Sequence, residues 1–147
     1  ACGVLAARAA LGHRCDVVGV VSVHAPAYQR SLAAGRVEAH AVSTQLADGM
    51  ACRTPVPEAL ALLAGAGDGR GLARVVAVTD AAVADAMRAL FHDTHHAAEG
   101  AGAAALAALL QERDAAPELV RDRRVAVILC GGNVDADVFG RVLLGGD

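Results

Sequence analysis

The chain has 147 residues, of which 55% are hydrophobic and only 2% aromatic, and its formal net charge is −3. This length suits one domain or a large piece of a longer protein, and it is enough to bury a core. The acidic balance gives no basic surface for nucleic acid, and no apolar run is long enough to span a membrane. The four cysteines are scattered without a C-x-x-C pair. We therefore expect no disulfide framework and no zinc site, and a reducing, cytoplasmic location.

Every one of the 13 basic residues is an arginine, so the chain has no lysine. It therefore offers no side-chain amine for a Schiff base with a carbonyl cofactor. The abundance of Ala, Gly and Arg is also typical of a GC-rich coding bias. Such a bias explains the replacement of surface lysines, but not the loss of a catalytic one.

The first half of the chain alternates helical segments with short apolar runs, which is typical of an α/β fold. The run at 17–21 is β-branched, as expected for a buried parallel strand. Gly12 and Gly35 follow helical segments and are expected to end them. The predicted elements are a helix over 4–11, a strand over 17–21, a helix over 28–34, an extended segment over 36–42 and a helix over 57–64.

The second half continues the alternation after a glycine-rich surface loop at 65–71. Val83, Met87 and Leu90 share one helix face and are expected in the core. No internal repeat or domain boundary divides the chain, so we predict one parallel sheet flanked by helices. The predicted elements are a strand over 74–78, a helix from Thr79 or Asp80 to 93, a helix from Gly100 and Gly102 to Arg113, a strand over 124–129 and a helix over 136–143.

Two glycine-containing segments stand where a ligand could bind. Ligands of open parallel sheets bind beyond the carboxyl ends of the strands, and Cys130 to Asn133 follow the predicted strand at 124–129. Glu99 precedes the buried helix that begins with Gly100. Taken alone, these residues also fit a tight turn at 130–133, an inert buried cysteine, and caps at Glu99 and Asn133.

These segments occur in a specific order: Asp48-Gly49, then Pro55-Val56-Pro57-Glu58, then Glu99-Gly100-Ala101-Gly102, and finally Cys130-Gly131-Gly132-Asn133. In order and spacing they resemble the pyridoxal-phosphate-dependent threonine/serine dehydratases of the tryptophan synthase beta-like superfamily. The similarity is greatest to the threonine dehydratase branch that includes enzymes of hydroxyectoine breakdown.

The resemblance implies a pyridoxal 5′-phosphate cofactor and the conversion of hydroxy-amino acids such as threonine and serine to a 2-oxo acid and ammonia. Residues 1–147 would form most of the large, cofactor-binding domain, as the C-terminal part of the catalytic region. The family's glycine-rich phosphate loop and Schiff-base lysine are expected upstream of residue 1. The complete enzyme is expected to be a homodimer or homotetramer, and this chain alone is expected to be inactive.

The resemblance also assigns roles to individual residues. It places the thiol of Cys130 at the ring nitrogen of the cofactor, where the family has an uncharged hydroxyl or thiol. Glu99 is implied to line the cofactor pocket, and the segment Asp48-Gly49 to form a wall of the substrate pocket. The cofactor-binding set implied in this way is Cys130, Gly131, Gly132, Asn133 and Glu99.

Two other interpretations of the chain remain open. A non-catalytic α/β binding or interaction module, either a remnant or the partner of a separate N-terminal half, agrees with the missing lysine. His92, His95 and His96 have helical spacing for a metal. However, His92 pairs with only one of the other two at a time, and no third ligand is evident nearby. We therefore predict no metal site.

Overall fold

The computed structural model describes residues 1–67 and 69–145. It contains six α-helices and two strands in these ranges, together with two short 3₁₀ turns. In chain order the elements are α1 (Cys2–Ala10), β1 (Val18–Ser22), α2 (Ala27–Ala34), η1 (Asp48–Met50), α3 (Pro57–Leu63), β2 (Arg74–Val78), α4 (Asp80–Thr94), α5 (Gly100–Ala115), η2 (Pro117–Leu119) and α6 (Ala136–Leu144).

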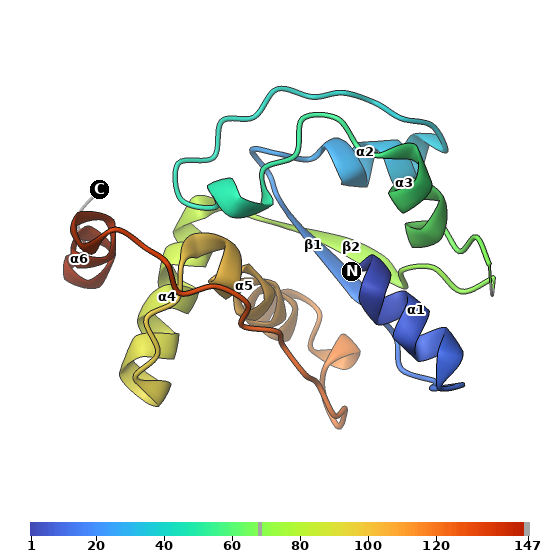
Figure 1. The fold of residues 1–147 in the computed structure, drawn as a ribbon. Helices are drawn as coiled ribbons and strands as arrows, with labels where there is room; N and C mark the ends of the chain where they lie inside the picture. The colour runs from blue at the N-terminus through green and yellow to red at the C-terminus, as the bar shows by residue number, and fades with distance from the viewer. Residues whose placement is uncertain (68, 146–147) are drawn as a thin grey trace.

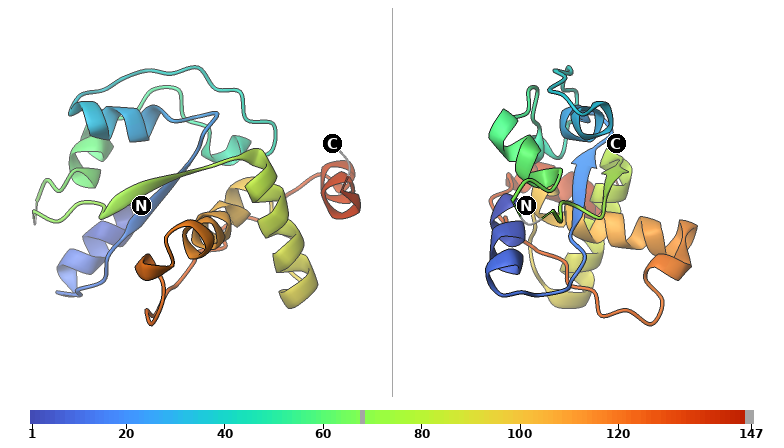
Figure 2. Two further views of the ribbon diagram at one scale, coloured as in Figure 1. Left: turned by 180° about the vertical axis from the view of Figure 1, so that it is seen from behind. Right: turned by 90° about the vertical axis from the view of Figure 1, so that its right-hand side faces the viewer.

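The two strands form a parallel pair that is flanked by helices, which confirms the α/β prediction. β1 and β2 pair from Val18 opposite Arg74 to Ser22 opposite Val78. Parallel neighbours need a crossover connection, and here the chain crosses over through α2 and α3. Figures 1 and 2 show α5 on one side of the strands and α1, α2 and α3 on the other. No helix of the described chain is both long and apolar enough to cross a membrane.

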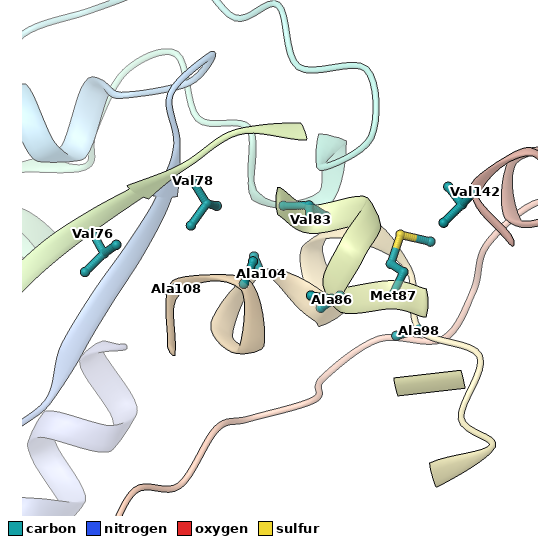
Figure 3. Close-up of a cluster of buried hydrophobic side chains, with 11 residues drawn as sticks. Val76, Val78, Val83, Ala86, Met87, Ala98, Ala104, Ala108 and Val142 are labelled. Atoms are coloured by element: carbon teal, nitrogen blue, oxygen red, sulfur yellow. The ribbon is translucent and has the colours of Figure 1, made fainter. Parts of the chain in front are cut away.

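The core lies where α4 and α5 pack against β2 (Figure 3). Val83 and Met87 are fully buried on one face of α4 together with Ala86, which confirms the prediction for these two, whereas Leu90 is only partly buried and packs against this core. The Thr79 side chain caps this helix by accepting a hydrogen bond from the amide of Ala82 at 3.1 Å. The cap fixes where α4 begins, and therefore which of its residues face the core.

Helix α5 packs closely because its buried side is made of glycine and alanine. Its buried residues are Gly100, Gly102, Ala103, Ala104, Ala107 and Ala108. A side chain at Gly100 would overlap the carbonyl oxygen of Leu46, and one at Gly102 would overlap the carbonyl oxygen of Gly131. The small residues therefore let two distant backbone segments reach the first turn of α5.

The predicted third strand at 124–129 is wrong. This segment belongs to neither a strand nor a helix, and Figure 1 shows it as an orange-red trace that passes α5 on the way to α6. Its apolar side chains are exposed, with 60% of Ile128 and 50% of Val125 accessible. An apolar, β-branched run becomes a strand only when a neighbour accepts and donates its backbone hydrogen bonds. The described sheet pairs β1 with β2 alone and does not include this segment.

Candidate functional site

The candidate site is formed by three segments that are far apart in the sequence. Gly49, Glu99 and Gly131, one residue from each segment, meet at the first turn of α5. The turn η1 is hydrogen-bonded through its preceding loop to Asp80, which follows the carboxyl end of β2. This is the edge of a parallel sheet at which ligands bind in α/β proteins. Of the residues that the resemblance assigned to the site, the structure thus brings Gly49, Glu99 and Gly131 together, and their roles toward a ligand stay a prediction.

The carboxylate of Glu99 lies against Gly131. A side chain added at residue 131 would overlap the Oε1 atom of Glu99, and the backbone amide of Glu99 donates to the carbonyl of Gly131 at 3.0 Å. Glu99 holds the N-cap position of α5, but its side chain makes no capping hydrogen bond. The simple capping role is therefore not what orients this side chain. Its carboxylate is directed toward the segment that contains Cys130.

The glycines of the 130–133 segment allow a close backbone approach. The carbonyl of Gly131 sits over Gly102, and a side chain at Gly132 would lie 2.9 Å from the carbonyl oxygen of Ala97. Both contacts are closer than a methyl group tolerates. The first contact requires glycine at residue 102 and the second favours glycine at residue 132, so both glycines let this segment lie close to the start of α5.

The segment Asp48-Gly49 forms a second side of the site. A carbon added at Gly49 would lie 3.1 Å from the Cβ atom of Ala101 and 3.6 Å from Oε1 of Glu99. The amide of Gly49 donates to the carboxylate of Asp48 at 2.9 Å. Both residues are exposed, so their polar groups are accessible from solvent. The role of Asp48-Gly49 as a wall of the substrate pocket stays a prediction.

Cys130 and Asn133 are both exposed. Cys130 is therefore not the inert buried cysteine of the simplest interpretation. Asn133 does not cap the last helix, because Asp135 occupies the N-cap position of α6 and this cap involves no side-chain hydrogen bond. Both side chains are accessible to a ligand at this edge.

The sequence pattern does not indicate Asp80 or Thr44 as residues near the site. The Thr44 hydroxyl donates to the carboxylate of Asp80 at 2.7 Å, and the amide of Gln45 donates to the other oxygen of that carboxylate at 2.7 Å. No local motif signals a contact between residues 36 positions apart. From the sequence, Asp80 is only a candidate helix cap, which is the role that Thr79 performs.

A charged pair joins β2 to α5, away from the candidate site. Arg74 at the start of β2 donates to both carboxylate oxygens of Glu112 on α5, at 2.5 and 2.6 Å. The hydrogen bond from Arg74 holds the pKa of Glu112 below its ordinary value. The same bond raises the pKa of Arg74. A bidentate pair of this kind fixes the register of α5 on the sheet.

The three neighbouring histidines do not share a helix face. Helix α4 ends at Thr94, and His95 adopts a left-handed conformation with φ of 58°. The Nδ1 atom of His96 lies 3.0 Å from the hydroxyl of Thr94. Within residues 1–67 and 69–145, no group of three or more His, Cys, Asp or Glu side chains is placed to hold a metal ion.

Comparison with known proteins extends over nearly the whole chain. The family model described as "Pyridoxal-phosphate dependent enzyme" matches residues 1–131. The chain is 32% identical over 141 residues to the L-threonine ammonia-lyase of Thermotoga maritima, and 35% identical over 141 residues to the phenylserine dehydratase of Ralstonia pickettii. Each alignment covers 96% of this chain.

A solved structure has the same fold over most of this chain. The chain superimposes on the threonine deaminase of T.th. with a TM-score of 0.77 and 29% identity, over 91% of this chain and 46% of that one. It spans 33% of the Thermotoga enzyme and 41% of the Ralstonia enzyme. The match therefore involves a part of each relative. By the extent of the family match, the chain belongs to the pyridoxal-phosphate-dependent enzyme family.

Proposed function

We propose that the chain is the cofactor-facing part of an ammonia-lyase that dehydrates and deaminates hydroxy-amino acids such as L-threonine and L-serine. The observation that carries this proposal is the convergence of Gly49, Glu99 and Gly131 on the first turn of α5. The relatives named as an L-threonine ammonia-lyase and a phenylserine dehydratase support this substrate class.

The residues at this site fit one side of a pyridoxal phosphate ring. The glycines at 131 and 132 keep the backbone close to α5, and the exposed Cys130 is available to the ring nitrogen. Glu99 and Asn133 provide polar groups beside the ring. When bound, the cofactor supplies an electron sink that stabilises negative charge at Cα of an amino acid. A thiol, unlike a carboxylate, does not hold a proton on the ring nitrogen, and this favours loss of the β-hydroxyl.

The chain does not provide every group that the cofactor needs. It has no lysine, so the amine for the Schiff base has to come from another segment of polypeptide. We therefore expect the isolated chain to be inactive. We also propose that the complete enzyme is a cytoplasmic homodimer or homotetramer.

A second candidate is a non-catalytic α/β binding module. The observation that favours it is the complete absence of lysine. The two candidates differ in what they require at residues 99 and 130–133. A cofactor site needs an accessible ring-binding surface there, whereas an interaction module does not.

Binding of pyridoxine 5′-phosphate tests the proposal. This compound has the ring and the phosphate of the cofactor but no aldehyde, so it needs no lysine. In an NMR titration of the isolated chain, we expect shift changes at Glu99, Gly131 and Gly132, even if the affinity is low. Cys130→Ala should weaken these changes, whereas Cys15→Ala, at another exposed cysteine, should leave them intact. Changes confined to other residues, or none at all, would favour the binding module.

A further inference from the structure

We propose that Asp80 is a positioning residue, which holds the pocket wall Asp48-Gly49 in place through Thr44. Asp80 does not contact the candidate site itself. The inference rests on the proposed function, because it gives this wall a role in the same site. Its structural basis is a continuous set of hydrogen bonds and close contacts from Asp80 to Gly49.

Both carboxylate oxygens of Asp80 are used outside its own helix. Oδ1 accepts from the Thr44 hydroxyl and Oδ2 from the amide of Gln45, each at 2.7 Å. An acidic residue in the first turn of a helix commonly acts on the helix dipole. Here the side-chain cap of α4 is made by Thr79, so Asp80 is free to bind the loop. Hydrogen bonds to a charged acceptor are stronger than neutral ones, which suits an anchor.

Thr44 relays this anchor to the turn that carries the wall. Its hydroxyl donates to Asp80 and also accepts from the amide of Ala47 at 3.0 Å. Ala47 is fully buried, and its carbonyl accepts from the amide of Met50 at 3.2 Å to close the turn η1. The Thr44 hydroxyl thus links Asp80 to the start of η1 through two hydrogen bonds.

The turn is held against α5 from the other side. The carbonyl oxygen of Leu46 occupies the space that a side chain at Gly100 would fill. Further along the chain, Gly49 lies next to Ala101 and Glu99. The segment is therefore held by Asp80 at Thr44 and by the start of α5 at Leu46 and Gly49. A shift at Thr44 changes the distance between Gly49 and Glu99, and with it the shape of the pocket.

Amide hydrogen exchange of the isolated chain tests the inference directly. Thr44→Val removes the relay and keeps the charge of Asp80 at the start of α4. We expect the amides of Ala47 and Met50 to exchange roughly ten- to a hundredfold faster, because Thr44→Val removes both the hydrogen bond to the Asp80 carboxylate and the hydrogen bond from the amide of Ala47. The amide of Val83 in the core should keep its rate. Thr44→Ser keeps the hydroxyl and should therefore exchange as slowly as the wild type. Ser43→Ala removes the neighbouring hydroxyl instead and serves as the matched control.

A double-mutant cycle shows whether the two residues act together. Asp80→Asn keeps one accepting oxygen and loses the charge, so an intermediate rate is expected. If Asp80 acts through Thr44, adding Thr44→Val to Asp80→Ala should make exchange no faster than in Asp80→Ala alone, a variant that also loses the hydrogen bond from the amide of Gln45. Additive effects, or unchanged exchange of Ala47 and Met50 in Thr44→Val, would overturn the inference. The Asp80→Asn variant keeps the test valid if Asp80→Ala fails to fold.

The pyridoxine 5′-phosphate titration separates this inference from the proposed function. Faster exchange together with weaker binding in Thr44→Val, restored by Thr44→Ser, supports both. Faster exchange with wild-type affinity would show that the wall does not shape the site, and the positioning role would be wrong. If the wild-type chain does not bind the compound, the proposed function fails, while the exchange rates still decide whether Asp80 holds the wall.

Discussion

The carboxylate of Glu99 and the backbone of Gly131 occupy adjoining space, so that any side chain at residue 131 would displace the carboxylate. Glu99 precedes α5, whereas Gly131 follows the extended segment after it. The contact therefore joins two of the four segments through which the chain resembles its family. It also makes the identity of residue 131 a determinant of where a negative charge is held in the candidate pocket.

Alanine substitutions separate a local change at this site from a packing defect. In Gly131→Ala, the new methyl group meets the end of a flexible glutamate side chain, so we expect Glu99 to move and the fold to persist. In Gly102→Ala, the methyl group meets the backbone of Gly131, and we expect a loss of about 1–3 kcal/mol in the free energy of unfolding. Urea unfolding measures both.

Gly140→Ala is the matched control for these two variants. Gly140 lies within α6, and nothing stands within 4 Å of a carbon added there. Alanine is the better helix former by about 1 kcal/mol, so this variant should be more stable than the wild type. The packing account of α5 is wrong if Gly102→Ala is stabilised to the same degree as Gly140→Ala.

The Arg74–Glu112 pair predicts a pH-dependent contribution to stability. The pKa of Glu112 is lowered in the folded protein by its hydrogen bond from Arg74. The pair therefore stabilises the fold fully above the ordinary pKa of 4.5, and this contribution is lost as the pH falls through the lower folded-state value. We expect a contribution of about 1 kcal/mol, because the pair is only partly shielded from solvent.

Urea unfolding from roughly pH 3 to roughly pH 7, a range that spans the ordinary carboxyl pKa, checks this prediction. Glu112→Gln should lower the stability at neutral pH and flatten its decline in acid. Glu118→Gln, at an exposed glutamate nearby, should follow the wild-type curve. Parallel curves for Glu112→Gln and the wild type would show that the pair does not contribute to the acid dependence.

The exposed apolar residues of the 125–129 segment predict self-association or dye binding. Val125 and Ile128 are at least half exposed, although both residue types are usually buried. Replacing both with threonine should reduce the binding of a hydrophobic dye such as ANS and leave the unfolding midpoint close to that of the wild type. A marked loss of stability in this variant would instead show that the two side chains are packed in solution.

Met87 tests the core that supports the site. It lies on α4, is fully buried, and belongs to the same core cluster as Ala98 and Val142 of α6 (Figure 3). Met87→Ala should lower the free energy of unfolding by about 2–5 kcal/mol, as expected for a large-to-small change in a packed core. Leu144→Ala, at a residue that is 89% exposed, should change it little. Equal effects of the two variants would contradict the assignment of this core.

Much of the fold follows from local sequence signals. The strand predicted over 74–78 has the bounds of β2, and Thr79 is the cap that its position indicates. The segment at 124–129 has an equally strong local pattern and is not a strand. A strand also depends on a partner, and the pairing of a parallel sheet is not local information. The failure therefore concerns hydrogen-bond partners and not the composition of the segment.

The candidate site was likewise only partly predictable from the sequence. The resemblance assigned the glycine segments to one site, but not how their side chains point. A glutamate before a helix fits a cap and a pocket equally well, and the structure shows that the Glu99 side chain makes no capping hydrogen bond and lies against Gly131. The Asp80–Thr44 contact left no trace in the sequence pattern, because it joins a helix start to a distant loop without a shared motif.

We propose above that Cys130 and its neighbours complete the site of an ammonia-lyase. The most direct test joins this chain to the segment of the Thermotoga maritima relative that precedes the matched region, in order to supply the missing amine. We predict that this chimera, loaded with pyridoxal phosphate, forms a 2-oxo acid and ammonia from threonine or serine. Cys130→Ser should retain activity, Cys130→Ala should lower kcat, and Cys15→Ala should not. A folded, cofactor-loaded chimera that releases no 2-oxo acid from either amino acid would contradict the claim.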